Sequence, residues 1–314
     1  MSNGNIFHNQ RYYALALDPI HVGTGGYRLG RVDLSIIREP SDNLPKIPGS
    51  SISGVTRAYT AMRTGHYCAG KGGAFGEDHC GESNCPVCVS FGFSKGQTQQ
   101  SLQGMAQFFD ARVIFFPVHS MAGPVWATAP AILRQAGMEN LPQVPTDQVR
   151  LATTLHPSPN QRLTQLNLGW LLLQAGDDLP TNEIGNALPD LPTDAPVLEE
   201  VFRRLVLLSD ELFSKVVNDN LEVRTSVAID PATGAADDKA LFTYEAMPRA
   251  TVLHFDVVYN NPQHFQIGGQ TIPHNISWVQ RHVEQGLALM QHLGVGGMNT
   301  RGMGRLQVLN LEEV

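Results

Sequence analysis

One continuous stretch, HVGTGGYRLGRVDLSIIREPSDNLPKIPGSSISGVTR at residues 21–57, constrains the fold more than any other part of the sequence. It opens with three glycines that can bend the backbone through positive φ and admit another backbone closely, namely Gly23, Gly25 and Gly26. Residues 31–38 then alternate as a strand, with Leu34 and Ile36 on one face and Asp33, Ser35 and Ile37 on the other. Because aspartate is depleted in strands, Asp33 calls for an explanation.

A helix over residues 50–63 is predicted to follow two prolines, because apolar side chains recur there at helical spacing. Ser50 or Ser51 would be its N-cap. The first turn would then combine free backbone N–H groups with two hydroxyls. Such a terminus is suited to an anion, and a phosphate would fit it.

Length and composition leave either one large domain with insertions or two domains open for these 314 residues. With 42% hydrophobic residues the chain can bury a full core. We expect a soluble cytoplasmic protein with no membrane partner, because neither a signal pattern nor a membrane-length apolar run is seen. A net charge of −7 argues mildly against nucleic-acid binding, but five arginines gather near the start and leave a local basic groove possible, namely Arg28, Arg31, Arg38, Arg57 and Arg63.

The order of the remaining elements favours an α+β core of ferredoxin-like or RRM type with insertions. Strands are predicted at 11–20, 106–116, 251–259 and 305–311, and helices from about Pro130, at 197–217 and at 278–293. Residues 117–129 read as a loop, and 142–196 as a mostly irregular, proline-rich insertion. The two apolar runs around Pro231–Gly234 resemble the arms of a long hairpin.

All four cysteines lie in one Gly-rich segment with the spacing C-x11-C-x4-C-x2-C, at Cys68, Cys80, Cys85 and Cys88. Disulfides are not expected in a cytoplasmic chain, and four thiolates suit a tetrahedral structural zinc site. We therefore predict Zn²⁺ here, with His66 or His79 as a possible replacement for Cys68. Four unrelated thiols in a mobile loop are the alternative.

A second Gly-rich motif, GVGGMNTRGMGR at 294–305, follows a helix and precedes a strand. Dinucleotide-binding and Walker loops have the opposite order, which argues strongly against both. Main-chain N–H groups and guanidinium groups both suit phosphate oxygens. We therefore predict a cradle for an RNA backbone, made by Gly296, Gly297, Thr300, Arg301 and Arg305.

Residue types and their spacing, taken by themselves, indicate few catalytic candidates. Asp33 is either a strand charge paired with Arg31 or Arg38, or a carboxylate that holds a divalent ion at a phosphate. His21 could be a general acid or base, or a histidine bonded to local backbone. Tyr244 and Glu245 could be ordinary strand residues. These patterns indicate a binder of RNA or a phosphate ligand and little more.

Six separated motifs resemble the RAMP proteins of CRISPR effectors, and most of all the backbone subunit of the Cmr, or type III-B, complex. They are HVGTGG at 21–26, VDLSIIRE at 32–39, IPGSSISGVTR at 47–57, FFPVHSMAGPVWATAP at 115–130, EVRTSVAIDPATGAADDKALFTYEAMPR at 222–249 and GVGGMNTRGMGR at 294–305. The resemblance implies an RRM-like palm at 1–63, 105–221 and 251–314, where 105–221 contains the proline-rich insertion. It also implies a finger-like insertion at 64–104 and a β-hairpin thumb at 222–250. The cysteine spacing separately predicts that a structural zinc ion stabilises the insertion.

The same resemblance implies a function. Copies of the chain would stack on a CRISPR guide RNA, each thumb would splay one nucleotide of the paired target RNA, and the target would be cut there with Mg²⁺ or Mn²⁺. The large polymerase-like subunit and the small subunit of the complex would be further partners. Asp33 would carry cleavage, with His21, Tyr244 and Glu245 assisting. RNA contacts are predicted at the C-terminal glycine cradle and at four earlier residues, Arg38, Ser50, Ser51 and Arg57.

The sequence departs from the family's pattern at two positions. The family commonly has a lysine where Ser53 stands and an arginine where His119 stands, so one guide-phosphate contact should be weaker unless Arg57 or the helix terminus compensates. Two alternatives stay open, a scaffold that binds RNA without cleaving it and the backbone nuclease of a Csm, or type III-A, complex.

Overall fold

The core of the molecule follows the order β-α-β-β-α-β of a ferredoxin-like unit. We describe it from a computed structural model that covers residues 5–25, 32–71, 79–94, 101–158, 160–227, 229, 231–234 and 241–312. The six elements are β1 (Phe7–Ala16), α1 (Gly49–Thr64), β6 (Ala111–Ser120), β14 (Val252–Asn260), α7 (Ile276–Ala288) and β17 (Leu306–Val308). The sheet order β17-β1-β14-β6 makes every neighbouring pair antiparallel. The α+β class predicted from the sequence is confirmed.

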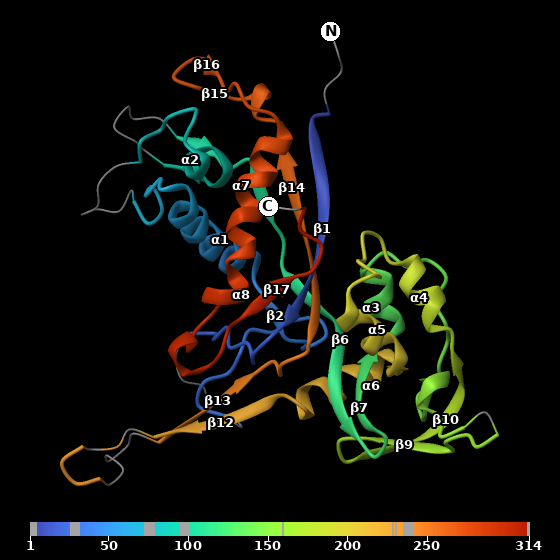
Figure 1. The fold of residues 1–314 in the computed structure, drawn as a ribbon. Coiled ribbons are helices and arrows are strands. Elements are labelled where there is room, and N and C mark those ends of the chain that lie inside the picture. The colour runs from blue at the N-terminus through green and yellow to red at the C-terminus, as the bar shows by residue number, and fades with distance from the viewer. Residues whose placement is uncertain are drawn as a thin grey trace.

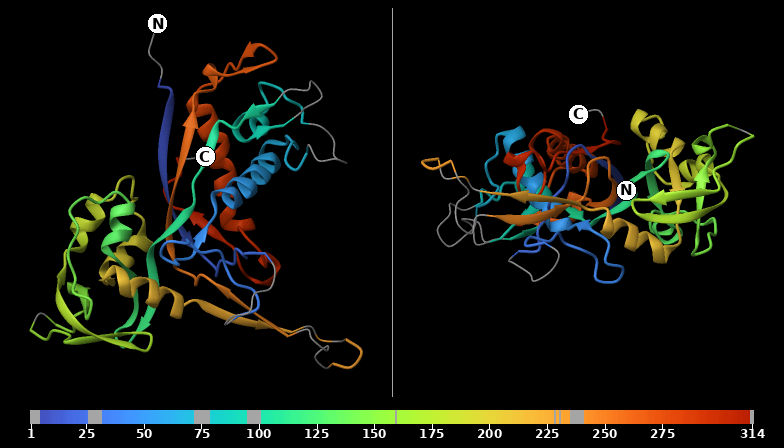
Figure 2. Two further views of the ribbon diagram at one scale, coloured as in Figure 1. Left: turned by 180° about the vertical axis from the view of Figure 1, so that it is seen from behind. Right: turned by 90° about the horizontal axis from the view of Figure 1, so that it is seen from below.

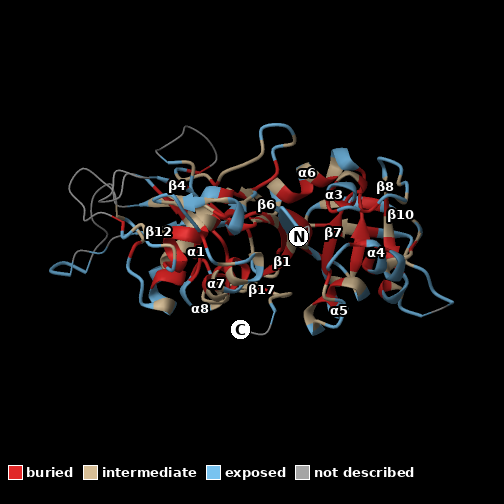
Figure 3. Cartoon of the chain, turned by 90° about the horizontal axis from the view of Figure 1, so that it is seen from above, coloured by how far each residue is buried: buried red, intermediate tan, exposed pale blue. Residues whose placement is uncertain are grey.

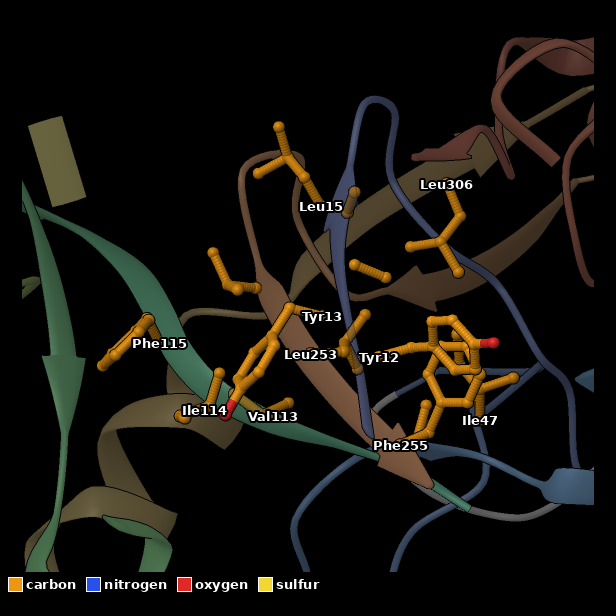
Figure 4. Close-up of a cluster of buried hydrophobic side chains, with 14 of the residues drawn as sticks. Tyr12, Tyr13, Leu15, Ile47, Val113, Ile114, Phe115, Leu253, Phe255 and Leu306 are labelled. Atoms are coloured by element: carbon orange, nitrogen blue, oxygen red, sulfur yellow. The ribbon is translucent and has the colours of Figure 1, made fainter. Parts of the chain in front are cut away.

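Helices α1 and α7 lie together on one face of this sheet, followed by α8 (Met290–Leu293) (Figures 1 and 2). Large apolar side chains from β1, β6 and β14 are buried on both faces of the sheet, with Tyr12 toward α7 and with Tyr13 and Phe115 toward the second lobe (Figure 4). The two helices approach closely at Gly286, where an added Cβ would lie 2.4 Å from Thr60 Oγ1. The buried Tyr12 hydroxyl also donates to Glu284 of α7 at 2.7 Å, which ties sheet and helix together.

Short elements complete this part of the chain. Strand β2 (Lys46–Ile47) pairs with β6, and β5 (Ala106–Phe108) pairs with β14. The cysteine segment contains α2 (Pro86–Phe91) and the pair β3 (Gly92–Phe93) and β4 (Leu102–Gln103). A second small pair joins β15 (Gln266–Ile267) to β16 (Gln270–Thr271), and three 3-10 helices lie at Thr153–Leu155, Pro262–His264 and Asn299–Arg301.

The second half of β6 continues into a second lobe, whose buried residues are continuous with the core of the first (Figures 1 and 3). Its strands follow the order β6-β7-β11-β8-β10-β9. They are β7 (Gly123–Thr128), β8 (Gln148–Ala152), β9 (Gln165–Leu168), β10 (Leu171–Leu179) and β11 (Leu205–Leu207). Four helices pack around them, α3 (Pro130–Gln135), α4 (Thr181–Ala187), α5 (Pro196–Arg203) and α6 (Asp210–Asp219).

Two predictions for this lobe were wrong because its prolines lie within strands and at the first positions of helices and do not mark irregular chain. Residues 117–129 form most of the β6–β7 hairpin and not a loop. Residues 142–196 contain three strands and a helix and are not mostly irregular. Pro130 and Pro196 occupy first helical positions, where the missing N–H costs nothing.

The single helix predicted over 197–217 was also wrong. The apolar run at 205–207 forms β11, which is fully buried between β7 and β8. A short apolar run fits a buried strand as well as a helix, so periodicity could not separate the two. Ser209 then starts α6, since its side chain accepts a hydrogen bond from Leu212 N.

Two further predictions near the N-terminus need correction. Residues 32–38 alternate as expected, with Ile36 buried and Asp33 exposed, but they form only isolated bridges to three different partners. Neither Ser50 nor Ser51 caps α1, because Pro48 holds the N-cap position and no side chain bonds there. The helix begins at Gly49, one residue before the predicted start.

The hairpin predicted at 222–250 is present as the antiparallel pair β12 (Glu222–Ser226) and β13 (Phe242–Ala246). It extends away from both lobes (Figures 1 and 2). Gly26, Arg28 and Arg31 lie outside the described residues. In the part of the chain that the structure describes, no helix is long and apolar enough to cross a membrane.

Candidate functional site

Three segments that are distant in sequence meet at the base of the hairpin (Figure 1). One edge of β13 pairs with β12, and the other edge binds residues 32–36. Leu34 N donates to Thr243 O at 3.0 Å, and Glu245 N donates to Leu34 O at 3.2 Å. The Gly-rich loop at 294–304 packs behind them, with Met303 buried against Tyr244. The predicted site residues Asp33, His21, Tyr244 and Glu245 are therefore brought together.

Among the described residues, Thr243 holds Asp33, and Arg38 does not pair with it. Asp33 Oδ2 accepts hydrogen bonds from Thr243 N at 2.7 Å and from Thr243 Oγ1 at 2.9 Å. Thr243 Oγ1 in turn accepts from Asp33 N at 3.1 Å. Among the described residues, no hydrogen bond reaches Asp33 Oδ1. The side chain is exposed, so this oxygen can bind a cation or a solvent molecule.

The hydrogen bonds from Thr243 also stabilise the charged form of Asp33. The backbone N–H of Thr243, and next its hydroxyl, lower the pKa of the Asp33 carboxyl below its ordinary value. Donors that bond to the ionised form stabilise that form. Asp33 is consequently a carboxylate at neutral pH, fixed in orientation by a strand.

His21 is buried against β13, the strand whose edge binds residues 32–36. Its Nδ1 lies 2.7 Å from Glu245 O. Because a carbonyl oxygen only accepts, Nδ1 carries the proton, and Nε2 faces Gly23, where a Cβ would lie 3.1 Å away. The ring packs edge-on to Tyr244 with centroids 5.9 Å apart. His21 is therefore bonded to backbone, as one of the two alternatives had it, but to that of Glu245, 224 residues away and not local.

Glu245 and Arg38 form a nearly buried ion pair. Glu245 Oε1 accepts from Arg38 Nη1 at 2.6 Å, and Oε2 accepts from Arg38 Nη2 at 2.9 Å. Glu245 Oε1 also accepts from Ile36 N at 2.9 Å, while Arg38 Nε donates to Asn218 Oδ1 at 2.9 Å. These bonds tie 36–38 to β13 and α6. The catalytic role of Glu245 and the RNA contact of Arg38 stay predictions, and the geometry gives both a structural task.

The Gly-rich loop is anchored on the backbone of His21. Gly297 N donates to His21 O at 2.8 Å. Gly296 has φ +81°, and a Cβ there would lie 2.4 Å from His21 O. Only glycine fits this close approach without displacing backbone.

Thr300 and Arg301 are exposed on the same loop. The Arg301 guanidinium lies over the Phe242 ring, 5.5 Å from its centroid. Arg305 is exposed but engaged, because Asp18 accepts its Nη2 bond at 3.0 Å and its Nε bond at 2.5 Å. Arg301 is therefore the better placed of the two cations for a phosphate.

The N-terminus of α1 differs from the predicted anion site. Asp110 Oδ1 accepts a hydrogen bond from Gly49 N at 2.8 Å. A carboxylate of the chain itself therefore uses the first backbone N–H of α1, which an external anion would otherwise bind. Ser50 is exposed beside it. Arg57 lies about two turns further along α1, where its Nη2 is 3.4 Å from His79 Nδ1. RNA contacts by Ser50, Ser51 and Arg57 stay predictions.

The four cysteines form one compact cluster. Their sulfur atoms all lie within 4.8 Å of one another, with Cys68–Cys80 at 3.5 Å and Cys80–Cys88 at 3.7 Å. A tetrahedral ion with Zn–S bonds of about 2.3 Å separates its ligands by roughly 3.8 Å. Cys85 also N-caps α2 by accepting from Cys88 N at 3.4 Å. The donor set fits zinc, and it includes Cys68 and neither His66 nor His79.

Sequence reasoning missed Thr243 and Asp110. Thr243 immediately precedes Tyr244, yet nothing in the sequence says that it faces Asp33, 210 residues away. That pairing depends on the hairpin register and on the docking of 32–36 along its edge. Asp110 follows a short strand and carries no motif, so no local signal marks it.

A family profile described as RAMPs, RAMP superfamily, matches residues 14–307. The CRISPR system Cmr endoribonuclease Cmr4 of Pyrococcus furiosus is 23% identical over 246 residues, or 76% of this chain and 77% of that protein. The crystal structure of oligomeric Cmr4 from that organism has a TM-score of 0.60 at 16% identity and covers 98% of this chain and 100% of its own.

A type III-B Cmr-beta structure in the apo state has a TM-score of 0.63 at 14% identity, covering 97% of this chain and 98% of its own. The Cmr-beta structure bound to cognate target RNA has a TM-score of 0.63 at 13% identity, with the same coverage. At these identities the structural likeness concerns the fold. The resemblance to the Cmr backbone subunit that the motifs indicated is confirmed by these similarities.

Proposed function

This chain belongs to the RAMP superfamily, and from that premise we propose that it is the backbone subunit of a type III-B CRISPR effector that cleaves target RNA. It would bind guide RNA in the cytoplasm as a filament of copies. The large polymerase-like subunit and the small subunit would complete the complex. The name of the Pyrococcus furiosus relative, an endoribonuclease, supports RNA cleavage.

One observation carries the catalytic part of the proposal. Asp33 is an exposed, ionised carboxylate whose orientation Thr243 fixes, and it lies at the base of the hairpin. The hairpin itself bears exposed apolar side chains suited to wedge between stacked bases, at Val223, Val227, Ile229 and Leu241. A thumb that unstacks a nucleotide would therefore leave it close to Asp33.

The chemistry needs little beyond this placement. A splayed nucleotide can align its 2′-hydroxyl with the adjacent phosphorus, and internal attack then depends on geometry and charge neutralisation. Asp33 Oδ1 would hold Mg²⁺ or Mn²⁺, which neutralises charge that develops on the phosphate. Arg301 on the neighbouring loop would bind a phosphate oxygen. Buried His21 and Glu245 would maintain the site, and Tyr244 would pack beneath it.

We also propose that the cysteine cluster binds one structural Zn²⁺. Four thiolate ligands close the coordination sphere, so this ion would stabilise the finger-like insertion and take no part in cleavage. The compact sulfur cluster supports this assignment.

The test uses the assembled complex, a labelled RNA complementary to the guide, and divalent metal present or chelated. Asp33→Asn keeps an acceptor for Thr243 but removes the charge, so we expect RNA binding to persist and cleavage to fall at least a hundredfold. Asp33→Ala should do the same, and Asp194→Ala, an exposed aspartate of the second lobe, should cleave normally.

Regularly spaced products that require metal would support the ribonuclease. Tight target binding by the unaltered complex without any cleavage would leave the scaffold alternative, and loss of RNA binding in Asp33→Asn would make Asp33 structural. A Csm-type complex would show the same chemistry, so co-purified subunits must separate type III-A from type III-B.

A further inference from the structure

One face of the hairpin root carries arginines from different parts of the chain. Strand alternation places Arg224 of β12 on the face that also carries its register partner Tyr244. The Gly-rich loop lies on this face, because Met303 is packed against Tyr244. At the end of that loop, Arg305 donates two hydrogen bonds to the carboxylate of Asp18. The hairpin and the loop therefore each bring an arginine to this face.

A third arginine, Arg249, lies in the turn between β13 and β14. This turn is fixed to the end of β1, since Ala250 N donates to Ala16 O at 2.7 Å. The next residue of the chain after β1 holds the backbone of Arg305, because Leu17 N donates to Arg305 O at 2.9 Å. The end of β1 thus brings the backbones of Arg249 and Arg305 together.

The pKa of the Asp18 carboxyl reflects all three arginines. Hydrogen bonds from Arg305 lower this pKa most, and the charges of Arg305, Arg249 and Arg224 lower it further. Opposite charges have this effect only when they are near the carboxyl. Arg224, Arg249 and Arg305 therefore surround Asp18, and we call them the arginine cluster.

The arginine cluster has more positive charge than its carboxylates compensate. Arg305 Nε lies 2.5 Å from Asp18 Oδ2. Arg224 Nε lies 2.5 Å from Glu222 Oε1. Arg249 is exposed, and among the described residues its side chain has neither a hydrogen bond nor an ion pair. Three guanidinium groups against two carboxylates leave one positive charge here, on a chain whose net charge is −7.

The turn that carries Arg249 is held in an uncommon conformation. Ala250 has φ +68°, a left-handed value that a residue other than glycine keeps only when its surroundings impose it. Its carbonyl accepts a hydrogen bond from Trp126 Nε1 at 2.9 Å. Thr251 Oγ1 also donates to Pro248 O at 2.7 Å. Arg249 is consequently presented by a fixed backbone, which reduces the entropy lost when its side chain binds a partner.

The opposite face of the hairpin carries the candidate for cleavage. Thr243 alternates with Tyr244, so its side chain lies on the face away from Arg224. Both hydrogen bonds to Asp33 Oδ2 come from Thr243. The next residue, Leu34, packs instead with Tyr244 on the face of the Gly-rich loop. Asp33 and the arginine cluster therefore lie on different faces of the hairpin.

We propose that the arginine cluster binds phosphates of the guide RNA, the strand that is not cut. Guanidinium groups suit phosphate oxygens, and Arg301 over Phe242 extends the same basic face along the hairpin. A backbone held on this face is kept away from Asp33, whereas a target strand must reach it. The inference rests on the function proposed above and adds Arg224 and Arg249 to its RNA contacts.

The first arm of the test measures binding of a fluorescently labelled guide RNA to the purified full-length chain, by anisotropy at several salt concentrations. Arg249→Gln should weaken binding several-fold and reduce the slope of log K against log salt by about 0.7, the value for one phosphate contact on a single strand. Arg249→Lys keeps the charge and should retain the slope. Arg224→Gln should reduce the slope less, because Glu222 already compensates its charge.

Asp18→Asn should have the opposite effect. It removes a carboxylate from the centre of the cluster and frees Arg305, so we expect guide RNA to bind more tightly and the salt slope to become steeper. A purely structural role of these residues would not strengthen binding. Binding of the Asp18→Asn variant no tighter than that of the native chain would contradict the proposal.

Arg134→Gln is the matched control, because Arg134 is an exposed arginine of α3 in the second lobe. It should leave the slope unchanged. Arg249→Gln should melt at the native temperature, since the side chain makes no bond among the described residues. An unaltered slope in Arg249→Gln, or an equal loss in Arg134→Gln, would overturn the proposal.

The second arm separates guide from target. Complexes assembled on saturating guide RNA are titrated with the complementary target, and Arg249→Gln should leave target affinity within about twofold of native, because the cluster contacts the other strand. A loss of target affinity without any loss of guide affinity would assign the cluster to the target and overturn the proposal.

Neither arm depends on cleavage, so Asp33→Asn should show the native salt slope. A complex that binds its guide through the cluster but cuts no target would refute the ribonuclease and leave this inference standing.

Discussion

At the scale of single residues, Thr243 fixes the orientation of Asp33 and lowers the pKa of its carboxyl further below the ordinary value. Two donors of Thr243 converge on Oδ2 and leave the other oxygen open. Arg38 pairs with Glu245 and not with Asp33, which removes one of the two arginine partners that the sequence offered for Asp33, and Arg31 lies outside the described residues. A carboxylate held in this way needs no cationic partner to stay ionised.

Thr243→Val tests this dependence through the pH profile of cleavage. The lowered pKa of Asp33 means that activity that needs its charge is present above that pKa and is lost as the pH falls through it. Removal of the hydroxyl leaves the backbone donor but raises the pKa, so the acid limb should move to higher pH. The measurement is the cleavage rate against pH with saturating metal.

Thr225→Val is the matched control, because Thr225 lies opposite Thr243 in the hairpin register. We expect it to leave the acid limb in place. An unchanged acid limb in Thr243→Val would show that the limb belongs to a group other than Asp33.

At the scale of elements, the Gly-rich loop and the turn after His21 form one unit. The close approach of Gly296 to His21 O explains why glycine occurs there, and the bond from Gly297 N secures the contact. This unit presents Arg301 beside the hairpin base.

Gly296→Ala should therefore be much more harmful than Gly302→Ala. Both positions have positive φ, at +81° and +75°, but a Cβ at Gly302 meets nothing within 4 Å. We expect Gly302→Ala to lower the free energy of unfolding by about 1 kcal/mol and Gly296→Ala by about 3 kcal/mol. Urea unfolding of the two variants measures the difference, and equal losses would contradict the close-approach argument.

The cysteine segment gives a second prediction at this scale. Metal analysis of the purified chain should find one zinc per molecule. Chelation of this zinc should lower Tm by roughly 5–10 °C, because the ion would stabilise a segment that has few other stabilising contacts. Cys68→Ser should lose the zinc, and His66→Ala should retain it. Retention by Cys68→Ser would instead indicate a histidine as fourth ligand.

At the scale of the whole molecule, an acidic chain is proposed to bind a polyanion. The net charge of −7 includes acidic residues of both lobes, whereas the surface at the hairpin base presents Arg301 next to a neutral glycine loop. Local placement of cations, and not net charge, would then govern guide binding.

Arg301→Ala should weaken guide RNA binding roughly evenly across sequences and reduce the slope of log K against log salt by about 0.7 to 1. Arg305→Ala should change the slope less, because Asp18 already compensates its charge. Arg203→Ala, an exposed arginine of the second lobe, is the control. Filter binding at several salt concentrations measures the slopes, and an unchanged slope in Arg301→Ala would count against the cradle.

Residue chemistry and local periodicity alone indicated the α+β class, α1 and α7, the hairpin, the four-cysteine set and the approximate places of the core strands. The first strand, predicted at 11–20, lies at Phe7–Ala16, and the run predicted as one strand at 106–116 divides into β5 and β6. The features indicated in this way depend on neighbours a few residues apart, which the sequence displays directly. The separation of 197–217 into α5, β11 and α6 depended on sheet partners elsewhere in the chain, as did the isolated bridges at 32–38.

Only the tertiary structure decided what surrounds the candidate site. Thr243 reaches Asp33, Arg38 pairs with Glu245, Asp110 takes the first amide of α1, and Arg305 bonds to Asp18. Each of these contacts joins residues far apart in sequence or depends on strand register. Hydrogen bonds and ion pairs need ångström-scale placement, and only the packed sheet, hairpin and loops provide it.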